Sequence, residues 1–289
     1  MENILWWEPR TELEAGVADL GIEMSQQESA FICGLLRAKR PAKILEIGVS
    51  AGGTTAVILK ALDLLDLPSQ VHSIDLLPRW ARDENKATGY VVDQYVPALT
   101  QRWKLYLGRV ASVPLKTIGR GIDFCVIDTM HIVPGELLDF LVTLPYLQTG
   151  SVVLLHDTAR HYDQPYSDNV FRYATSLLFS SVVADKLALI NQHQKEGLSN
   201  LSAFIVTDDT KKYIANVFLA LTVSWSYLPA KNIIDDFLLG LHPFYSPELI
   251  DLFVRIINTN LMMRGRNMRY ATDDNKKILL NTLAEKVSI

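Results

Sequence analysis

The stretch that decides the fold runs Ile44-Leu45-Glu46-Ile47-Gly48-Val49-Ser50-Ala51-Gly52-Gly53-Thr54-Thr55. It begins as a short apolar strand and ends where a helix can start, with glycines in the turn between them. Glycine lets a backbone bend tightly and lets a ligand approach it closely, and a helix N-terminus adds unsatisfied N–H donors. In open α/β sheets, nucleotide-like ligands bind at such a turn, at the carboxyl end of a parallel strand. The stretch therefore predicts a binding turn that includes Gly48, Ser50 and Gly52.

Glu46 narrows the class of ligand. The dinucleotide fingerprint G-x-G-x-x-G has a glycine where this chain has Glu46. A carboxylate at that position suits a cationic or hydroxyl-bearing ligand better than a pyrophosphate. The pattern E-x-G-x-x-x-G resembles the first motif of the class I S-adenosylmethionine (SAM)-dependent methyltransferases. This resemblance implies that Glu46, Gly48, Ser50 and Gly52 belong to a SAM site.

Composition points to an ordinary globular protein. The 289 residues are 49% hydrophobic and 21% charged, with a formal net charge of −4, which gives no reason to expect nucleic acid or an anionic membrane as a partner. Cys33 and Cys125 each lie in an apolar run, as buried thiols in a reduced compartment do. No signal-peptide pattern begins the sequence, and no apolar stretch is long enough to span a bilayer. We expect a cytoplasmic protein.

Short apolar segments alternate with helical ones along two thirds of the chain. Parallel strands are expected over 43–47, 71–75, 104–107, 123–128 and 151–156, with helices over 25–37, 54–65 and 134–144. Two more strands, 186–190 and 201–207, are separated by a loop too short for a helical crossover, so they should be antiparallel. The sequence predicts an α/β fold with a Rossmann-like sheet of seven strands, the last one antiparallel. That sheet resembles the one of the class I methyltransferases.

Three regions are expected. Residues 1–22 form an N-terminal arm, residues 23–208 the SAM-dependent methyltransferase domain, and residues 209–289 a helical extension with helices over 211–227, 232–240, 246–264 and 274–287. The extension carries too much apolar helical surface to stand free in water. It should pack against the domain, a second subunit or both, and we expect a homo-oligomer.

Acids follow three of the predicted strands. Asp75 ends the second strand, where an acid of this fold hydrogen-bonds ribose hydroxyls, although it could also be a helix cap or a solvated acid. Asp128 and Asp157 follow the fourth and fifth strands, which places them side by side at the carboxyl edge of the sheet. Two adjacent carboxylates repel each other unless a positive group joins them, and a hard divalent cation with oxygen ligands is the usual one. The alternative is that Asp128 and Asp157 each cap a helix.

The segments around these acids resemble a subgroup of the family. I-D-x-x-H at Ile127–His131 and G-x-V-x-L-H-D at Gly150–Asp157 are similar to metal-dependent small-molecule O-methyltransferases related to the macrolide-sugar methyltransferases and the cephalosporin hydroxylase-type proteins. The resemblance implies that Asp128 and Asp157 bind Mg²⁺, that Asp128 also borders the SAM site, and that His131 is the general base. It also implies a hydroxyl acceptor that binds the metal.

The chain departs from this pattern after the fifth strand. Relatives often have two adjacent acidic or amide ligands there, whereas the neighbours of Asp157 are His156 and Thr158. His156 is a candidate third ligand, but imidazole suits Mg²⁺ less well than oxygen does. The site could instead hold Mn²⁺, or recruit Asp163 or water.

The sequence thus favours a SAM-dependent methyltransferase that methylates a hydroxyl of a small molecule, a glycan or a natural-product intermediate with the help of Mg²⁺ or Mn²⁺. A second hypothesis is a protein that binds SAM without catalysis, as an interaction module of a biosynthetic pathway. A third is an NAD-dependent enzyme, against which Glu46 and the antiparallel final strands argue.

Overall fold

A computed structural model of the protein describes residues 25–160, 172–188 and 200–263. The strands are β1 Lys43–Ile47, β2 Gln70–Asp75, β3 Arg79–Trp80, β4 Asp83–Ala87, β5 Trp103–Leu107, β6 Ile122–Ile127, β7 Leu147–His156, β8 Asp185–Ala188 and β9 Leu201–Ile205. The helices are α2 Gln26–Lys39, α3 Gly53–Leu64, α4 Tyr90–Tyr95, α5 Leu115–Ile118, α6 Gly135–Thr143, α7 Ala174–Ser181, α8 Asp208–Lys212, α9 Ala215–Ala220, α10 Lys231–Leu241 and α11 Pro247–Met263. Two 3₁₀ turns, Pro97–Arg102 and Leu144–Tyr146, precede β5 and β7.

Seven of the strands form one sheet in the order β5-β2-β1-β6-β7-β9-β8. The five strands from β5 to β7 are parallel, and β9 runs antiparallel to both of its neighbours, β7 and β8. The prediction of a seven-stranded Rossmann-like sheet with a reversed last strand is therefore confirmed. The order reverses between β1 and β6, and the carboxyl ends of these two strands carry the glycine turn and Asp128.

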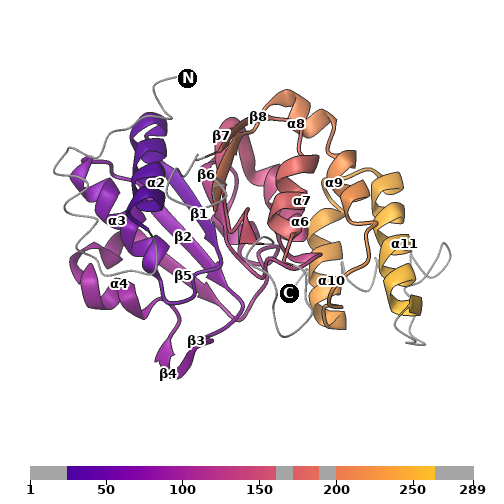
Figure 1. Cartoon of the computed structure of the whole chain (residues 1–289), viewed down its shortest axis with the longest axis horizontal. Helices are drawn as coiled ribbons and strands as arrows, with labels where there is room; N and C mark the ends of the chain where they lie inside the picture. Colours follow the sequence, from indigo (N-terminus) through magenta and orange to yellow (C-terminus); the bar gives the residue numbers. More distant parts are fainter. Residues whose placement is uncertain (1–24, 161–171, 189–199, 264–289) are drawn as a thin grey trace.

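Helices cover both faces of the sheet, and two apolar cores result (Figure 1). One core lies under α2, α3 and α4, and the other under α6, α7 and the C-terminal helices. Successive residues of each central strand alternate between the cores: Phe124 and Val126 face the first, while Cys125 and Ile127 face the second. Period-two alternation into two apolar layers is why these strands read as continuous apolar runs.

None of the elements between β2 and β5 was predicted: the hairpin, α4 and the 3₁₀ turn Pro97–Arg102. Residues 79–87 form a two-stranded hairpin, β3–β4, which projects beyond the sheet ahead of α4 (Figure 1). β4 is polar and exposed, with the sequence Asp-Glu-Asn-Lys-Ala, so neither hydrophobic periodicity nor β propensity marks it as a strand. The hairpin matters because two of its residues border the cavity described below.

The C-terminal helices correct one prediction. Instead of a single helix over 211–227, the chain forms α8 and α9 and then leaves helical structure. The spacing of Val217, Leu221 and Trp225 fits a helix, but the backbone N–H of Trp225 donates to Asn260 Oδ1 on α11 (2.9 Å), and these three residues pack into the core around α6. Tertiary contacts therefore override the local pattern. The predictions for α10 and α11 hold to within two residues, whereas those for residues 1–22 and 274–287 lie outside the described residues.

The helical extension shares its core with the sheet. Phe237 and Leu238 of α10 and Phe253 and Ile257 of α11 belong to the same buried cluster as the residues of α6. Within the described residues, no helix is long and apolar enough to cross a bilayer. The thiols of Cys33 and Cys125 are both buried, as the sequence predicted.

Candidate active site

The turn after β1 has no room for side chains at two of its glycines. Gly48 has φ +88°, and a Cβ there would lie 1.7 Å from the carbonyl oxygen of Asp128. Gly52 has φ +96°, and a Cβ there would lie 2.8 Å from the Cα of Gly89. Glycine adopts both of these backbone conformations with little cost in free energy, because it has no Cβ. The turn is thus fixed by close approach of the backbone at the ends of β6 and β4, and it leads directly into α3.

Glu46 lies beneath this turn, fully buried. Its Oε2 accepts hydrogen bonds from the hydroxyls of Thr55 on α3 and Ser73 on β2, both at 2.6 Å, and Trp103 Nε1 donates to Ser73 Oγ at 2.8 Å. Burial raises the pKa of Glu46 to about 7, although both hydroxyls act in the opposite direction. Glu46 therefore ties β1 to β2 and to the first turn of α3, and it does not line the cavity.

Asp75 holds the turn from the side. Its Oδ2 accepts the backbone N–H groups of Val49 (2.9 Å) and Ser50 (3.0 Å), and its Oδ1 accepts that of Leu77 (2.8 Å). A carboxylate has about four acceptor sites, so these three bonds leave room for a further donor such as a ribose hydroxyl. The predicted ribose acid thus also positions the amides of the turn.

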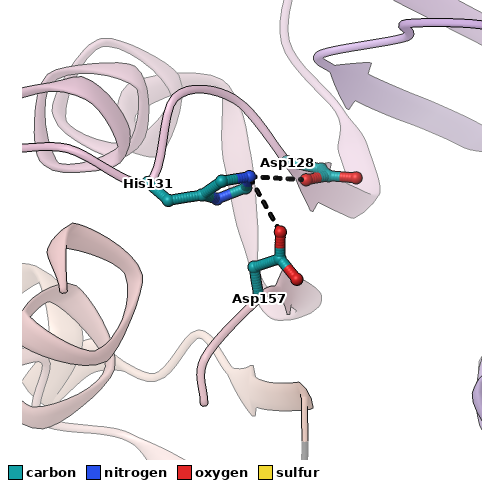
Figure 2. A group of neighbouring side chains, drawn as sticks. All are labelled: Asp128, His131 and Asp157. Atoms are coloured by element: carbon teal, nitrogen blue, oxygen red, sulfur yellow. Dashed lines mark ion pairs between the residues drawn. The ribbon is translucent and has the colours of Figure 1, made fainter. Parts of the chain in front are cut away.

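Asp128 and Asp157 do lie side by side, and His131 points between them (Figure 2). His131 Nε2 is 2.9 Å from Asp157 Oδ2 and 3.7 Å from Asp128 Oδ1. One potential ligand atom from each of the three residues lies within 4.8 Å of the other two. Among the described residues, these three side chains are therefore close enough together to hold a metal ion. α6 begins after Pro134 without a side-chain cap, so the alternative that Asp128 caps this helix does not hold.

His156, the predicted third metal ligand, also lies near the two acids. Its Nδ1 is 3.4 Å from Asp157 Oδ1 and 3.7 Å from Asp128 Oδ1. Asn200, which precedes β9, donates from Nδ2 to Asp157 Oδ1 at 2.7 Å and to Glu28 Oε1 on α2 at 3.4 Å. The two carboxylates are thus surrounded by two imidazoles and an amide. The other candidate ligand, Asp163, lies outside the described residues.

The charges of this cluster are strongly coupled. Burial alone would lower the pKa of His131, but Asp157, Glu136 and Asp128 outweigh it and raise this pKa to about 10. His156 is raised to about 9 by Asp128 and Asp157 against the same effect of burial. Burial opposes ionisation of Asp157 as well, yet the two histidines hold its pKa well below the ordinary value. Burial raises the pKa of Asp128, and the two histidines act against this effect. The histidines and the carboxylates of the cluster thus favour one another's charged forms.

A cavity of about 370 Å³ joins the glycine turn to this cluster. One end is lined by residues of the turn and of the start of α3, namely Val49, Ser50, Ala51, Gly53 and Thr54, and the other by Asp128, Thr129, His131, His156 and Asp157. The remaining wall comes from Trp80, Arg82, Tyr90 and Val91 of the hairpin and α4, together with Glu28, Arg160 and Asn200. The ring centroids of Trp80 and Tyr90 are 5.4 Å apart, and the ammonium of Lys86 lies 4.6 Å from the ring centroid of Tyr90. A donor at the turn and an acceptor at the carboxylates could therefore meet in one space.

Sequence reasoning missed several of these wall residues. Trp80, Arg82 and Tyr90 lie in a segment without strand periodicity, and the one signal for it is the length of chain between β2 and β5. Glu28 and Asn200 both border the cavity although they are 172 residues apart in the chain. No local pattern in a single sequence connects two such residues.

Comparisons with known proteins found one family model and several solved structures of methyltransferases. Residues 45–158 match the family model described as a methyltransferase domain. Among solved structures, a proposed O-methyltransferase from Klebsiella pneumoniae is 17% identical (TM-score 0.49; 70% of this chain and 92% of that chain covered). The O-methyltransferase TomG from Streptomyces achromogenes, in complex with SAM, is 18% identical (TM-score 0.45; 68% of this chain and 91% of that chain covered). The SAH-bound methyltransferase PaMTH1 from Podospora anserina is 14% identical (TM-score 0.47; 68% of this chain and 89% of that chain covered). No curated protein matches the chain.

The matched segment begins within β1 and ends just after Asp157, so it contains the glycine turn, Asp75 and the carboxylate cluster. The order of the strands is the one expected of a Rossmann-like methyltransferase sheet. Residues 45–158 of the chain are therefore similar to a methyltransferase domain both in their family model and in the arrangement of their strands.

Proposed function

We propose that the protein transfers the methyl group of SAM to a hydroxyl oxygen of a small acceptor, with a divalent cation, Mg²⁺ or Mn²⁺, bound by Asp128 and Asp157. The observation that carries the proposal is the single cavity that contains both the glycine turn and the Asp128–His131–Asp157 group. A methyl donor and an acceptor must be aligned in line within one space, and positioning is the main contribution of such an enzyme.

The residues present fit SAM. Close packing of the backbone at Gly48 and Gly52 fixes the shape of the turn, which leads into the N-terminus of α3, and Asp75 keeps one acceptor site. Val49, Ser50 and Thr54 border the cavity directly. SAM supplies the electrophilic methyl group, and Asp75, Ser50 and the turn would bind and orient it.

The residues present also fit a divalent cation. Asp128 and Asp157 supply carboxylate oxygens from adjacent strand ends, and His156 supplies an imidazole nitrogen within 3.7 Å of both. Two oxygens with one nitrogen suit Mn²⁺ at least as well as Mg²⁺. When bound, the cation polarises a coordinated hydroxyl and lowers its pKa.

His131 is the proposed proton acceptor. Its ring borders the cavity with the side chain 13% exposed, and Nε2 faces the carboxylates. A base must be neutral to accept a proton, whereas Asp157, Glu136 and Asp128 outweigh burial and raise the pKa of this ring to about 10. A cation bound to Asp128 and Asp157 would weaken their effect on His131 and lower the pKa of its ring. The cation and the base would therefore act together. The acceptor's hydroxyl proton would then go to His131 Nε2 as the oxygen takes the methyl group.

The test measures methyl transfer from SAM to catechol (1,2-dihydroxybenzene) and to methyl glycosides with vicinal hydroxyls, with and without chelator. We expect turnover that disappears with EDTA and returns with Mg²⁺ or Mn²⁺. His131→Ala should lower kcat by about 10²–10⁴-fold with SAM affinity nearly unchanged. Turnover that survives complete chelation would remove the cation from the proposal, and tight SAM binding without transfer to any hydroxyl would favour a non-catalytic SAM-binding protein.

A further inference from the structure

Glu136 is a buried carboxyl group that the proposed reaction does not use. It lies in the first turn of α6, five residues after His131, and its side chain is fully buried. A carboxyl group without contact to water costs free energy unless other groups compensate it. Its surroundings therefore indicate what it does.

The contacts of Glu136 among the described residues go to His131. The backbone N–H of His131 donates to Glu136 Oε1, and His131 Nδ1 lies 3.4 Å from the same oxygen. The other oxygen, Oε2, is buried and has no hydrogen-bond partner within the described part of the chain. One carboxylate oxygen thus faces both the main chain and the ring of His131.

His131 is consequently held from two sides. Nε2 faces Asp157 at 2.9 Å on the cavity side, and Nδ1 faces Glu136 on the side of the core. The backbone of His131 has φ +60°, a conformation that a residue with a side chain seldom adopts unless its surroundings fix it. The bond from the His131 N–H to Glu136 is one such constraint.

We propose that Glu136 is a positioning residue for His131, which holds the backbone of His131 and the orientation of its ring so that Nε2 faces the cavity and the acceptor. His131 Nδ1 makes no hydrogen bond within the described residues, so Glu136 acts on the ring through its charge at 3.4 Å and through its bond to the His131 backbone. This inference rests on the proposed function of His131. It adds a residue that would touch neither acceptor nor cofactor.

The experiment compares Glu136→Gln with Asp139→Asn. Asp139 is the matched control because it is another buried carboxyl group on α6, one turn later, and it accepts from the Thr129 hydroxyl at 3.1 Å and makes no contact with His131. Glutamine keeps an oxygen for the backbone N–H of His131 but removes the charge beside Nδ1. With SAM, Mg²⁺ and catechol as the probe, E136Q should lower kcat by about 10–10³-fold, with KM for catechol and SAM affinity within about threefold of wild type. D139N should leave kcat within about threefold.

Two further measurements separate positioning from folding. In a His131→Ala background, adding E136Q should cause no further loss of kcat, since its effect passes through the ring. The ¹⁵N resonance of His131 Nδ1, assigned with H131A, should shift in E136Q and stay in place in D139N. Wild-type kcat in E136Q, an equal loss in both backgrounds, or an unmoved Nδ1 resonance would each overturn the proposal. If wild type methylates no hydroxyl probe, the proposed function fails, and the Nδ1 resonance alone still decides whether Glu136 orients His131.

Discussion

The burial of Glu46 predicts a specific dependence of stability on pH. The change to make is Glu46→Gln, which keeps the shape of the side chain and an acceptor for Thr55 and Ser73 but removes the ionisable group. In the folded protein the pKa of Glu46 is raised from 4.5 to about 7, because the carboxyl is completely buried. The folded state therefore holds this proton over a range of pH in which the unfolded chain has already lost it.

The sign and size follow by linkage. Between the unfolded pKa and the folded pKa, the native state binds more protons than the unfolded state, so the free energy of unfolding falls as pH rises. A carboxyl with pKa 4.5 unfolded and about 7 folded loses on the order of 2–3 kcal/mol of stability between pH 5 and pH 8, at 1.36 kcal/mol per pKa unit. Above pH 8 this contribution should change little further.

Urea unfolding followed by tryptophan fluorescence, repeated from pH 5 to pH 8, measures the effect. Glutamine adds its own pH-independent cost, since its amide would occupy the place of the unpartnered Oε1. The decisive quantity is therefore how the difference between E46Q and wild type changes with pH, and it should move by about 2–3 kcal/mol in favour of E46Q. Glu84→Gln on the exposed strand β4 is the control for the same chemical change.

A constant difference between E46Q and wild type across this pH range would refute the reasoning. It would mean that the carboxyl is ionised or protonated equally in both states. The environment of Glu46 under the glycine turn would then differ from the one described above.

Three other outcomes are expected. Gly48→Ala should lower the free energy of unfolding by at least about 2 kcal/mol, because its Cβ would meet the Asp128 carbonyl, whereas Gly108→Ala, with φ +73° and open space around it, should cost less in a urea titration. Adding Mg²⁺ should lower the pKa of His131 from about 10, as followed by NMR, and an unchanged titration would argue against a cation at Asp128 and Asp157. A chain truncated after Asp208 should aggregate or lose its oligomeric state on gel filtration, since Phe253 and Leu238 belong to the core around α6, and a soluble, fully active monomer would contradict this.

The sequence by itself determined the sheet. β1 was predicted at its observed bounds and the other sheet strands to within a few residues, because each is an apolar run next to glycine or acidic punctuation. The antiparallel pairing of β8 and β9 could also be predicted from the sequence, because the connection between them is too short for a crossover helix. The positions of Asp128 and Asp157 beside each other could also be predicted, because the carboxyl ends of neighbouring parallel strands lie at one edge of the sheet.

The tertiary structure decided which side chains meet around those acids. A local pattern suggests that His131 lies near Asp128, but it cannot tell that the ring reaches Asp157 with Nε2 while Nδ1 faces Glu136. The motif predicts that Glu46 contacts the ligand, whereas in the structure its carboxyl is buried beneath the turn, between the hydroxyls of Thr55 and Ser73. Period and propensity act between neighbours along the chain, whereas burial, pKa and ring orientation are set by groups brought in from distant strands and helices. The cavity wall is the clearest example, since Glu28, Trp80 and Asn200 border one space only because the folded sheet brings α2, the hairpin and the start of β9 to it.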